Sequence, residues 1–186
     1  MKKLTLLTAL LCASLFAFAA EPENYALASN GSTATASSGN AALAIDGNEG
    51  TRWESATTDD ETWTVNMGQQ RTFNMVRILW EGAYAKEFTI KYSADGENWT
   101  MFHDETNLAS AGWQTIYKEA SVTGQYIQYH GTKRATQWAQ SFYEFQVMQG
   151  EAPKENIAKG KTIVASSGGQ NDPARVLGGT GSSRRQ

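Results

Sequence analysis

The sequence predicts an all-β fold, an antiparallel β-sandwich or jelly roll. About seven or eight short runs alternate apolar and polar residues with a period of two, as expected for strands with one buried face. Turn-forming residues, mostly Gly, Asn, Asp and Ser, separate these runs. No stretch shows the period of an amphipathic helix, and many short strands with frequent turns are typical of sandwiches and jelly rolls.

The expected strands follow one another from residue 33 to residue 147. The mostly apolar run 73–80 predicts a strand buried on both faces, and Asp95-Gly96 predicts a hairpin turn. Four tryptophans within or beside strands are expected in the core, namely Trp53, Trp63, Trp80 and Trp99. The expected strands are 33–36, 62–65, 73–80, 88–92, 99–102, 113–117, 126–129 and 143–147.

Residues 1–19 have the features of a secretory signal peptide. A basic start and an apolar run precede the small-x-small pattern Ala17-Phe18-Ala19, which predicts cleavage after Ala19. The run is too short for a transmembrane anchor, which needs about 20 apolar residues. A lipoprotein signal at Cys12 would need a small residue where Leu11 stands. We therefore expect a secreted protein, and cleavage removes Cys12, the only cysteine, so that no disulfide can stabilise the domain.

The end of the chain repeats the opening of the domain before it. Ala-Ser-Ser-Gly at 36–39 recurs at 165–168, and the flanking segments also correspond in order and spacing. We interpret 20–150 as one domain, 151–155 as a linker and 156–186 as the incomplete start of a second copy. Chance similarity between Ser- and Gly-rich segments is the alternative. The second copy stops before its core strands, so it cannot bury a core of its own.

Charge and motifs exclude several classes of function. Removing the two signal-peptide lysines changes the formal net charge from −3 to −5 (−3 − 2). No basic run precedes Arg184-Arg185, so neither nucleic-acid binding nor membrane insertion is expected. His103 and His130 lie in no nucleophile motif, and no carboxylate pair is marked out as a glycosidase would require. We expect a protein without catalytic activity.

The segment 43–53 places an acid, a glycine, an amide and a hydroxyl close together. Calcium takes about six to eight oxygen ligands from carboxylates, carbonyls and hydroxyls, and a tight loop can present them together. Gly47 would allow the bend that such a loop needs. Asp46-Gly47-Asn48 is also compatible with an ordinary turn that holds no metal.

The order of motifs along 24–150 resembles that of the discoidin or coagulation factor 5/8 type C domains, which include the family 32 carbohydrate-binding modules. The signature is A-x-D-G-N-x-x-T-R-W at 44–53, and four further segments follow in family order, at 63–68, 80–84, 93–99 and 134–145. The resemblance implies an eight-stranded jelly roll of the galactose-binding type with a structural calcium ion.

The resemblance also implies a set of calcium ligands. The carboxylates of Asp46 and Glu144 would join an early loop to the last strand through the ion, which would close a long chain loop without a disulfide. Backbone carbonyls and the Thr51 hydroxyl would complete the site. The full expected set is Leu43, Asp46, Asn48, Thr51, Tyr143 and Glu144.

Members of this family bind sugars in loops at one end of the sandwich. An aromatic ring, here Tyr84 or Trp138, would face the sugar ring, and charged side chains would meet its hydroxyls. Many sugar-binding relatives carry a histidine just beyond the Thr-Arg-Trp segment, and this sequence has none there. Two alternatives stay open, since Tyr84 can instead pack beneath its loop and Arg134 can be structural. The candidate ligand-binding residues are Glu81, Tyr84, Lys86, Arg134, Trp138 and Gln140.

The resulting hypothesis is a secreted, calcium-stabilised and non-catalytic carbohydrate-binding module. It would recognise a glycan or polysaccharide and belong to a larger secreted glycoside hydrolase or surface protein, with a catalytic domain as its neighbour. The alternative is a cell-adhesion module that binds protein or lipid. Animal discoidin domains of that kind usually have a cysteine pair that joins their ends, which the mature chain lacks.

Overall fold

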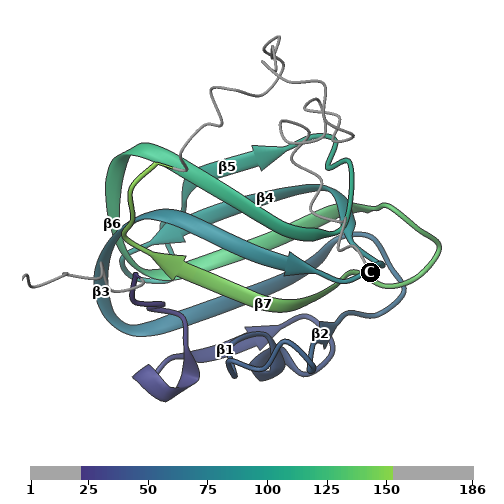
Figure 1. Ribbon diagram of the computed structural model, residues 1–186, viewed down its shortest axis with the longest axis horizontal. Coiled ribbons are helices and arrows are strands. Elements are labelled where there is room, and N and C mark those ends of the chain that lie inside the picture. Colours follow the sequence, from purple (N-terminus) through teal and green to yellow (C-terminus); the bar gives the residue numbers. More distant parts are fainter. Residues whose placement is uncertain (1–21, 153–186) are drawn as a thin grey trace, which may run out of the picture.

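The computed structural model describes residues 22–152, which form a β-sandwich of seven strands and two short 3-10 helices (Figure 1). The expected signal peptide and the expected second copy at 156–186 lie outside the described residues, as does most of the expected linker. Within 22–152, no helix is long and apolar enough to cross a membrane. The elements are η1 (Ala28–Asn30), β1 (Thr33–Ala36), η2 (Ala41–Ala44), β2 (Trp53–Glu54), β3 (Glu61–Trp80), β4 (Ala85–Ser93), β5 (Thr100–Glu105), β6 (Gly112–Arg134) and β7 (Ser141–Met148).

Two of the strands are much longer than the sequence pattern predicts. The runs 62–65 and 73–80 were expected as separate strands but are the two halves of β3, and 113–117 and 126–129 both belong to β6. The ladder between β3 and β6 is irregular between Asn66 and Arg71, where Gly68 has a φ of +74°. This local break lets one continuous strand change direction, so the polar residues around Gly68 lie within β3, at a point where its ladder to β6 is interrupted.

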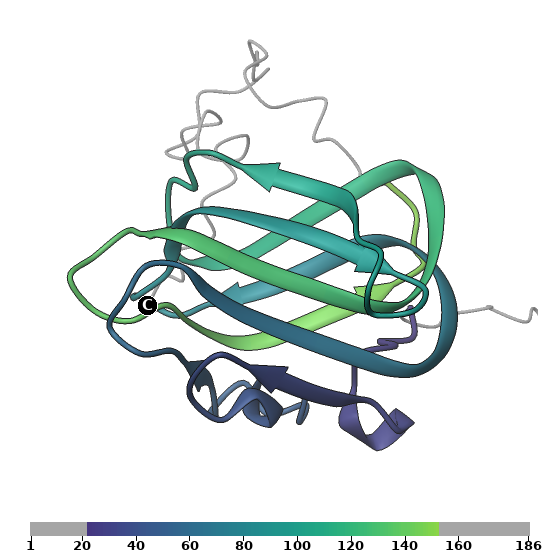
Figure 2. The same ribbon diagram turned by 180° about the vertical axis from the view of Figure 1, so that it is seen from behind.

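The long strands β3 and β6 pass through both layers of the sandwich, as the front and back views show (Figures 1 and 2). In one layer, β7 pairs with the end of β3, and β2 pairs with β7. In the other layer, β1 pairs with the start of β3, and β4 lies between the end of β6 and β5. Every strand pairing is antiparallel, so the predicted antiparallel β-sandwich is confirmed.

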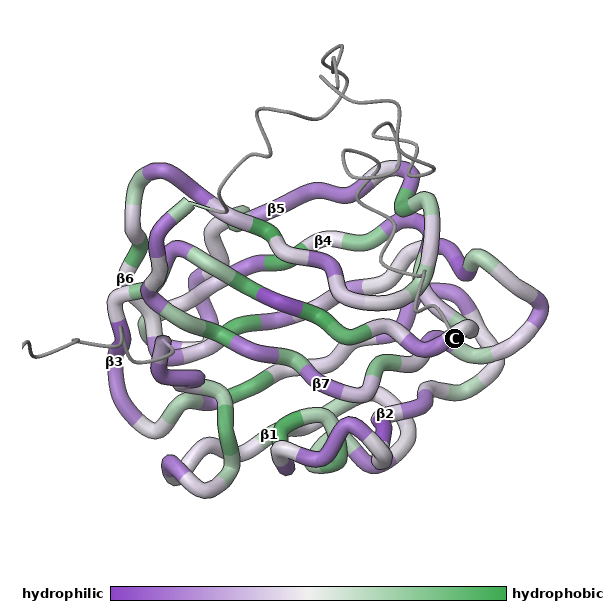
Figure 3. Tube along the Cα trace, in the orientation of Figure 1, coloured by the Kyte–Doolittle hydropathy of each residue, from purple (hydrophilic) through white to green (hydrophobic). Residues whose placement is uncertain are grey.

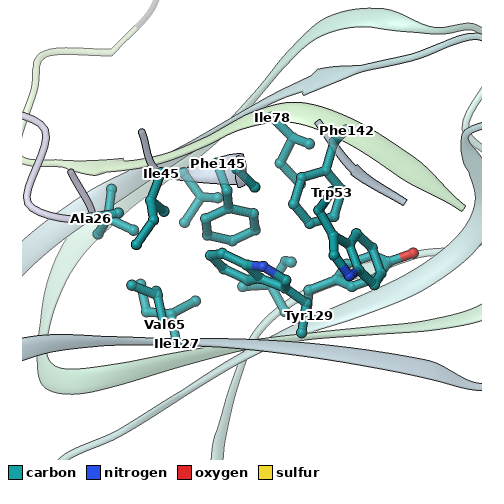
Figure 4. Packing of buried hydrophobic residues seen from close by; sticks show 14 of the residues in the cluster. Ala26, Ile45, Trp53, Val65, Ile78, Ile127, Tyr129, Phe142 and Phe145 are labelled. Carbon is teal, nitrogen blue, oxygen red and sulfur yellow. The ribbon is translucent and has the colours of Figure 1, made fainter. Parts of the chain in front are cut away.

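Aromatic side chains from both layers fill the core (Figure 4). Trp53 packs on Phe142 with ring centroids 4.7 Å apart, and Trp63 packs on Phe145 at 4.8 Å. The two indole N–H groups donate to backbone carbonyls, Trp53 to Ser38 (2.8 Å) and Trp63 to Ala41 (3.0 Å), so these polar atoms are satisfied inside the core. Such packing supplies stability that a domain without disulfides needs.

Three of the four tryptophans expected in the core are buried, namely Trp53, Trp63 and Trp80. The expectation for Trp99 was wrong, because this residue is only half-buried between the Asp95-Gly96 turn and β5. The turn itself is confirmed: Gly96 has a φ of +82°, and the Asp95 carboxylate accepts the backbone N–H groups of Glu97 and Asn98.

The second half of β3 is buried on both faces only in part. Residues 73–76 are buried, but Arg77 and Leu79 are half-buried on the outer face, opposite the core residues Ile78 and Trp80. Figure 3 shows hydrophobic and hydrophilic residues alternating along the strands of this layer. The outer face of β3 therefore remains partly open to solvent near the end of the strand.

Candidate functional site

A pocket of about 470 Å³ lies at the end of the sandwich where β3 ends and β7 begins. This is the end at which the loop between β6 and β7 projects, on the right of Figure 1. Three separate parts of the chain meet there: β2 with its flanks, the turn after β3, and the loop before β7. The lining residues are Arg52, Glu54, Thr57, Glu81, Gly82, Ala83, Trp138 and Ala139.

Trp138 presents the largest exposed aromatic surface of the pocket, with 64% of the residue accessible to solvent. The Trp138 N–H donates to the Thr136 hydroxyl (3.1 Å), which tightens the loop before β7. Arg134 also holds this loop, because its guanidinium lies 3.3 Å from the Gln137 carbonyl and 3.5 Å from the Trp138 carbonyl. An indole that remains exposed although its backbone is fixed offers a flat, preorganised surface to a ring-shaped ligand.

Two carboxylates give the pocket its acidic character. The Glu81 carboxylate accepts the Ala83 N–H (2.7 Å), and this bond outweighs the effect of burial and keeps the pKa of Glu81 below its usual value. The Glu54 carboxylate accepts both Nε (3.0 Å) and Nη2 (2.6 Å) of Arg52 through a single oxygen, Oε2. With one guanidinium against two carboxylates, the lining carries a net charge of −1.

The six candidate ligand-binding residues do not all meet at this pocket. Glu81 and Trp138 line it. Tyr84 is half-buried against the core, and its hydroxyl donates to the Ala109 carbonyl (3.2 Å). Lys86 lies on β4, outside the lining. Gln140 is fully buried, where it bonds the Tyr129 hydroxyl and the Thr58 carbonyl, so it supports the pocket from behind.

Arg134 holds the loop that carries Trp138, and its own guanidinium donates to the Asp59 carboxylate (2.9 Å). It is not among the lining residues. Sequence reasoning missed Arg52, Glu54 and Thr57, which do line the pocket. Glu54 directly follows the Thr-Arg-Trp segment, so an acid next to this motif was the available signal.

Replacing Arg134 with glutamine is expected to weaken ligand binding without changing the pocket lining. The variant loses the bonds to the loop carbonyls and the ion pair with Asp59, which together predict an affinity about three- to tenfold lower. Calorimetric titration of the parent and of Arg134→Gln with the same ligand would measure the change in affinity. The neighbouring Lys133→Gln, which removes an exposed ion pair with Glu87, is the matched control and should bind like the parent. Equal affinity of Arg134→Gln and the parent would contradict this role.

A second cluster, rich in oxygen atoms, surrounds the loop after η2. The buried residue Ile45 anchors this loop, and Asp46 follows it. The Thr51 hydroxyl lies 2.7 Å from Asp46 Oδ2 and 2.9 Å from the Asn48 carbonyl. The one hydroxyl proton must be shared between these two acceptors, so acceptor oxygens outnumber donor protons at this point of the loop.

Glu144 of β7 faces the same loop from the last strand. Its Oε1 accepts the Gly47 N–H (3.0 Å), whereas its Oε2 is buried without a hydrogen-bond partner. Burial, followed by the nearby Asp46 carboxylate, raises the pKa of Glu144 to about 7. An unpartnered buried carboxylate oxygen beside a second carboxylate is the arrangement that a bound cation would neutralise.

The donor set fits calcium, because the oxygens come from two carboxylates, a hydroxyl and backbone carbonyls. Asp46, Asn48, Thr51 and Glu144 would supply ligands, with Leu43 on η2 and Tyr143 on β7 beside them. Within residues 22–152, no group of three or more His, Cys, Asp or Glu side chains forms a metal site, so carbonyl oxygens would have to complete the shell. A bound calcium ion would join the loop to the last strand and neutralise Glu144.

The fold and the two clusters define an antiparallel β-sandwich with an end-loop pocket and an oxygen-rich loop. Residues 28–145 match the model of the F5/8 type C domain, and the chain belongs to this family. None of the curated proteins compared with the chain matches it.

Solved structures of carbohydrate-binding modules share this fold. Chitosan-binding module 1 from a chitosanase/glucanase of Paenibacillus sp. IK-5 is 39% identical, with a TM-score of 0.62 over 67% of this chain and 98% of that chain. Chitosan-binding module 2 of the same enzyme, solved with chitotriose, is 30% identical, with a TM-score of 0.62. The match covers 67% of this chain and 99% of that chain. The family 32 module of C. perfringens NanJ, solved with galactose, is 21% identical, with a TM-score of 0.57 over 62% and 92%, and shows the fold alone.

Proposed function

We propose that this chain is a secreted carbohydrate-binding module that recognises a polymer of glucosamine, such as chitosan. The observation that carries the proposal is the pocket in which the exposed Trp138 stands beside the carboxylates of Glu54 and Glu81. An indole stacks on the apolar face of a pyranose ring, and a carboxylate pairs with an ammonium group. Glucosamine carries both features on one unit.

The relatives support this choice of sugar. Two chitosan-binding modules that are 39% and 30% identical to this chain align over nearly their whole length. The net charge of −1 on the lining also favours a cationic sugar over a neutral one. We further propose that the module serves a larger secreted glycoside hydrolase, because those two modules derive from a chitosanase/glucanase. The module would hold the enzyme on its polysaccharide without catalysing a reaction.

Titration with two trimers tests the proposed sugar. The full chain should bind the glucosamine trimer and bind the N-acetylglucosamine trimer at least about tenfold more weakly, because acetylation removes the charge. Glu81→Gln should lose most of that preference, since the amide cannot pair with an ammonium. Glu119→Gln, at an exposed position of β6, is the matched control and should keep it. Equal binding of both trimers by the parent protein would refute the proposal.

We also propose that calcium binds between the Asp46 loop and Glu144 and stabilises the module. The unpartnered Oε2 of Glu144 supports this role, together with the shared proton of Thr51. The ion would lie in the cluster after η2, apart from the pocket lining. Its contribution would therefore be to stability and to the position of the Arg52-Trp53 segment, which follows Thr51 directly.

A further inference from the structure

A second exposed tryptophan lies at the same end of the sandwich as the pocket. Among the described residues, three large hydrophobic side chains are exposed: Trp138 (64%), Met101 (44%) and Trp113 (40%). Trp113 is the second residue of β6, and β6 begins at the end of the molecule where β3 terminates (Figure 1). An exposed indole so near a candidate sugar pocket is a candidate contact for the same ligand.

The strand register connects Trp113 to the pocket. Trp113 pairs with Leu79 of β3, and Gly112 pairs with Trp80. Glu81, which lines the pocket, follows Trp80 directly. Leu79 therefore lies about 7 Å along the chain from Glu81, and Trp113 lies about 5 Å to the side of Leu79 on the neighbouring strand. A ligand longer than the pocket can reach the indole by following the edge of the sheet.

No second strand of the described chain pairs with this edge. The first half of β6 pairs with β3 alone, because the ladder to β4 begins only at Tyr126. The side chains of Trp113 and Thr115 point outward, since Ile116 faces the core and Gln114 bonds the buried Trp80 from the inner side. Leu79 and Trp113 therefore share the outer face of this layer, two residues before Glu81 of the pocket lining.

Arg77 decides which sugar this surface can accept. Its guanidinium carbon lies 4.3 Å from the centroid of the Trp113 ring, which covers one side of the indole and holds it in place. Arg77 forms no salt bridge with any described residue, so its charge is not neutralised by a carboxylate. This charge repels an ammonium group but does not oppose a neutral sugar.

We propose that Trp113 and Arg77 form a second sugar-binding subsite, which takes an uncharged unit of the same polysaccharide whose glucosamine unit occupies the pocket. This inference rests on the proposed function, since it assumes that the pocket binds glucosamine. The two subsites differ in charge: the pocket lining is net negative, and the indole edge carries a free guanidinium. The module therefore prefers chains that are partly N-acetylated and long enough to span both subsites.

Chain length and acetylation together test this subsite. The full chain is titrated with the glucosamine trimer, the glucosamine hexamer and a mixed hexamer of glucosamine and N-acetylglucosamine. We expect the mixed hexamer to bind about tenfold more tightly than the trimer, because one additional sugar stacks on the protein. The affinity of the glucosamine hexamer should exceed that of the trimer by a smaller factor. Trp113→Ala should bind the trimer like the parent and lose the gain for the mixed hexamer.

Two further variants separate a binding role from other effects. Trp113→Phe retains a ring and should keep part of the gain, whereas Met101→Ala, at the other exposed hydrophobic position outside the pocket, should keep all of it. The parent and Trp113→Ala could bind the mixed hexamer more tightly than the trimer by the same factor. That result would show that a longer chain binds better only because more of its units can occupy the pocket, and it would overturn the subsite. Failure of the parent to bind the glucosamine trimer would instead refute the proposed function.

Discussion

Replacing Trp138 with alanine is expected to weaken binding of the glucosamine trimer by about 30- to 100-fold, as for a central binding residue. Trp138 is the most exposed large hydrophobic residue of the described chain and the only aromatic residue of the pocket lining. Thr136 and Arg134 hold the backbone of its loop, so the loop loses little freedom when a sugar stacks on the ring. Titration calorimetry of parent and variant gives the ratio directly.

The stability of the variant should not change, which separates this effect from misfolding. Because Trp138 is 64% exposed, its removal leaves no cavity in the core, and the midpoint of thermal unfolding should stay within a few degrees of the parent value. Trp138→Tyr keeps a ring and should retain much of the affinity. A Trp138→Ala protein that binds the trimer as tightly as the parent would show that the sugar lies elsewhere.

Removal of calcium is expected to have the largest effect on stability. If the ion is present at about a thousand times its dissociation constant, its binding contributes about 4 kcal/mol to the free energy of unfolding. Chelation should therefore lower the midpoint of thermal unfolding by roughly 10 °C or more. Differential scanning calorimetry with calcium and with a chelator would measure this difference, and equal midpoints in the two conditions would rule out the metal site.

The pH dependence of the stability of the metal-free protein, measured in chelator, follows from the pKa of Glu144. Its pKa in the folded protein, about 7, lies above the ordinary value of 4.5, because burial and the Asp46 carboxylate disfavour its charge. Between these two values the folded state binds more protons than the unfolded state, so the metal-free protein loses stability as pH rises from about 4.5 through about 7. Calcium offsets this loss by pairing with the ionised carboxylate, so the stabilisation by calcium should grow with pH over the same window.

Glu144→Gln provides a matched variant for this prediction. In chelator above pH 7 it should be more stable than the parent, because it carries no unpartnered buried charge beside Asp46. With calcium present the order should reverse, since the variant lacks a ligand to the ion. If the parent is the more stable protein in chelator at every pH, Glu144 is not the destabilising group.

Much of the fold was predictable because strand patterning is local. Alternation of apolar and polar residues identified the position of β1, the β4 strand and its Asp95-Gly96 turn, and the buried Trp53, Trp63 and Trp80. These features depend on neighbours within a few residues, which the sequence displays directly. The same pattern could not show that β3 and β6 are continuous, because the polar stretch around Gly68 reads as a loop.

The candidate sugar pocket was predictable only in part. Sequence reasoning selected Glu81 and Trp138 from loops that the family uses, and both line the pocket. It also selected Gln140, which is fully buried, and it omitted Arg52 and Glu54, which face the pocket. In a loop, whether a polar side chain points outward or inward depends on what packs against it from distant parts of the chain.

The sequence by itself determined the β-sandwich, the family motifs and the acid-glycine-amide loop at 46–48, because each is a short pattern with a direct physical meaning. The family resemblance had already implied that the Asp46 loop meets Glu144. Tertiary structure alone decided that Glu54 joins Glu81 and Trp138 in the pocket, and that Arg77 lies against Trp113 at the sheet edge. Each of these sets joins residues from different strands or loops. The register of the long strands β3 and β6 and the order of strands in the sheet bring these residues together. The local alternation of apolar and polar residues determines neither the register nor the strand order.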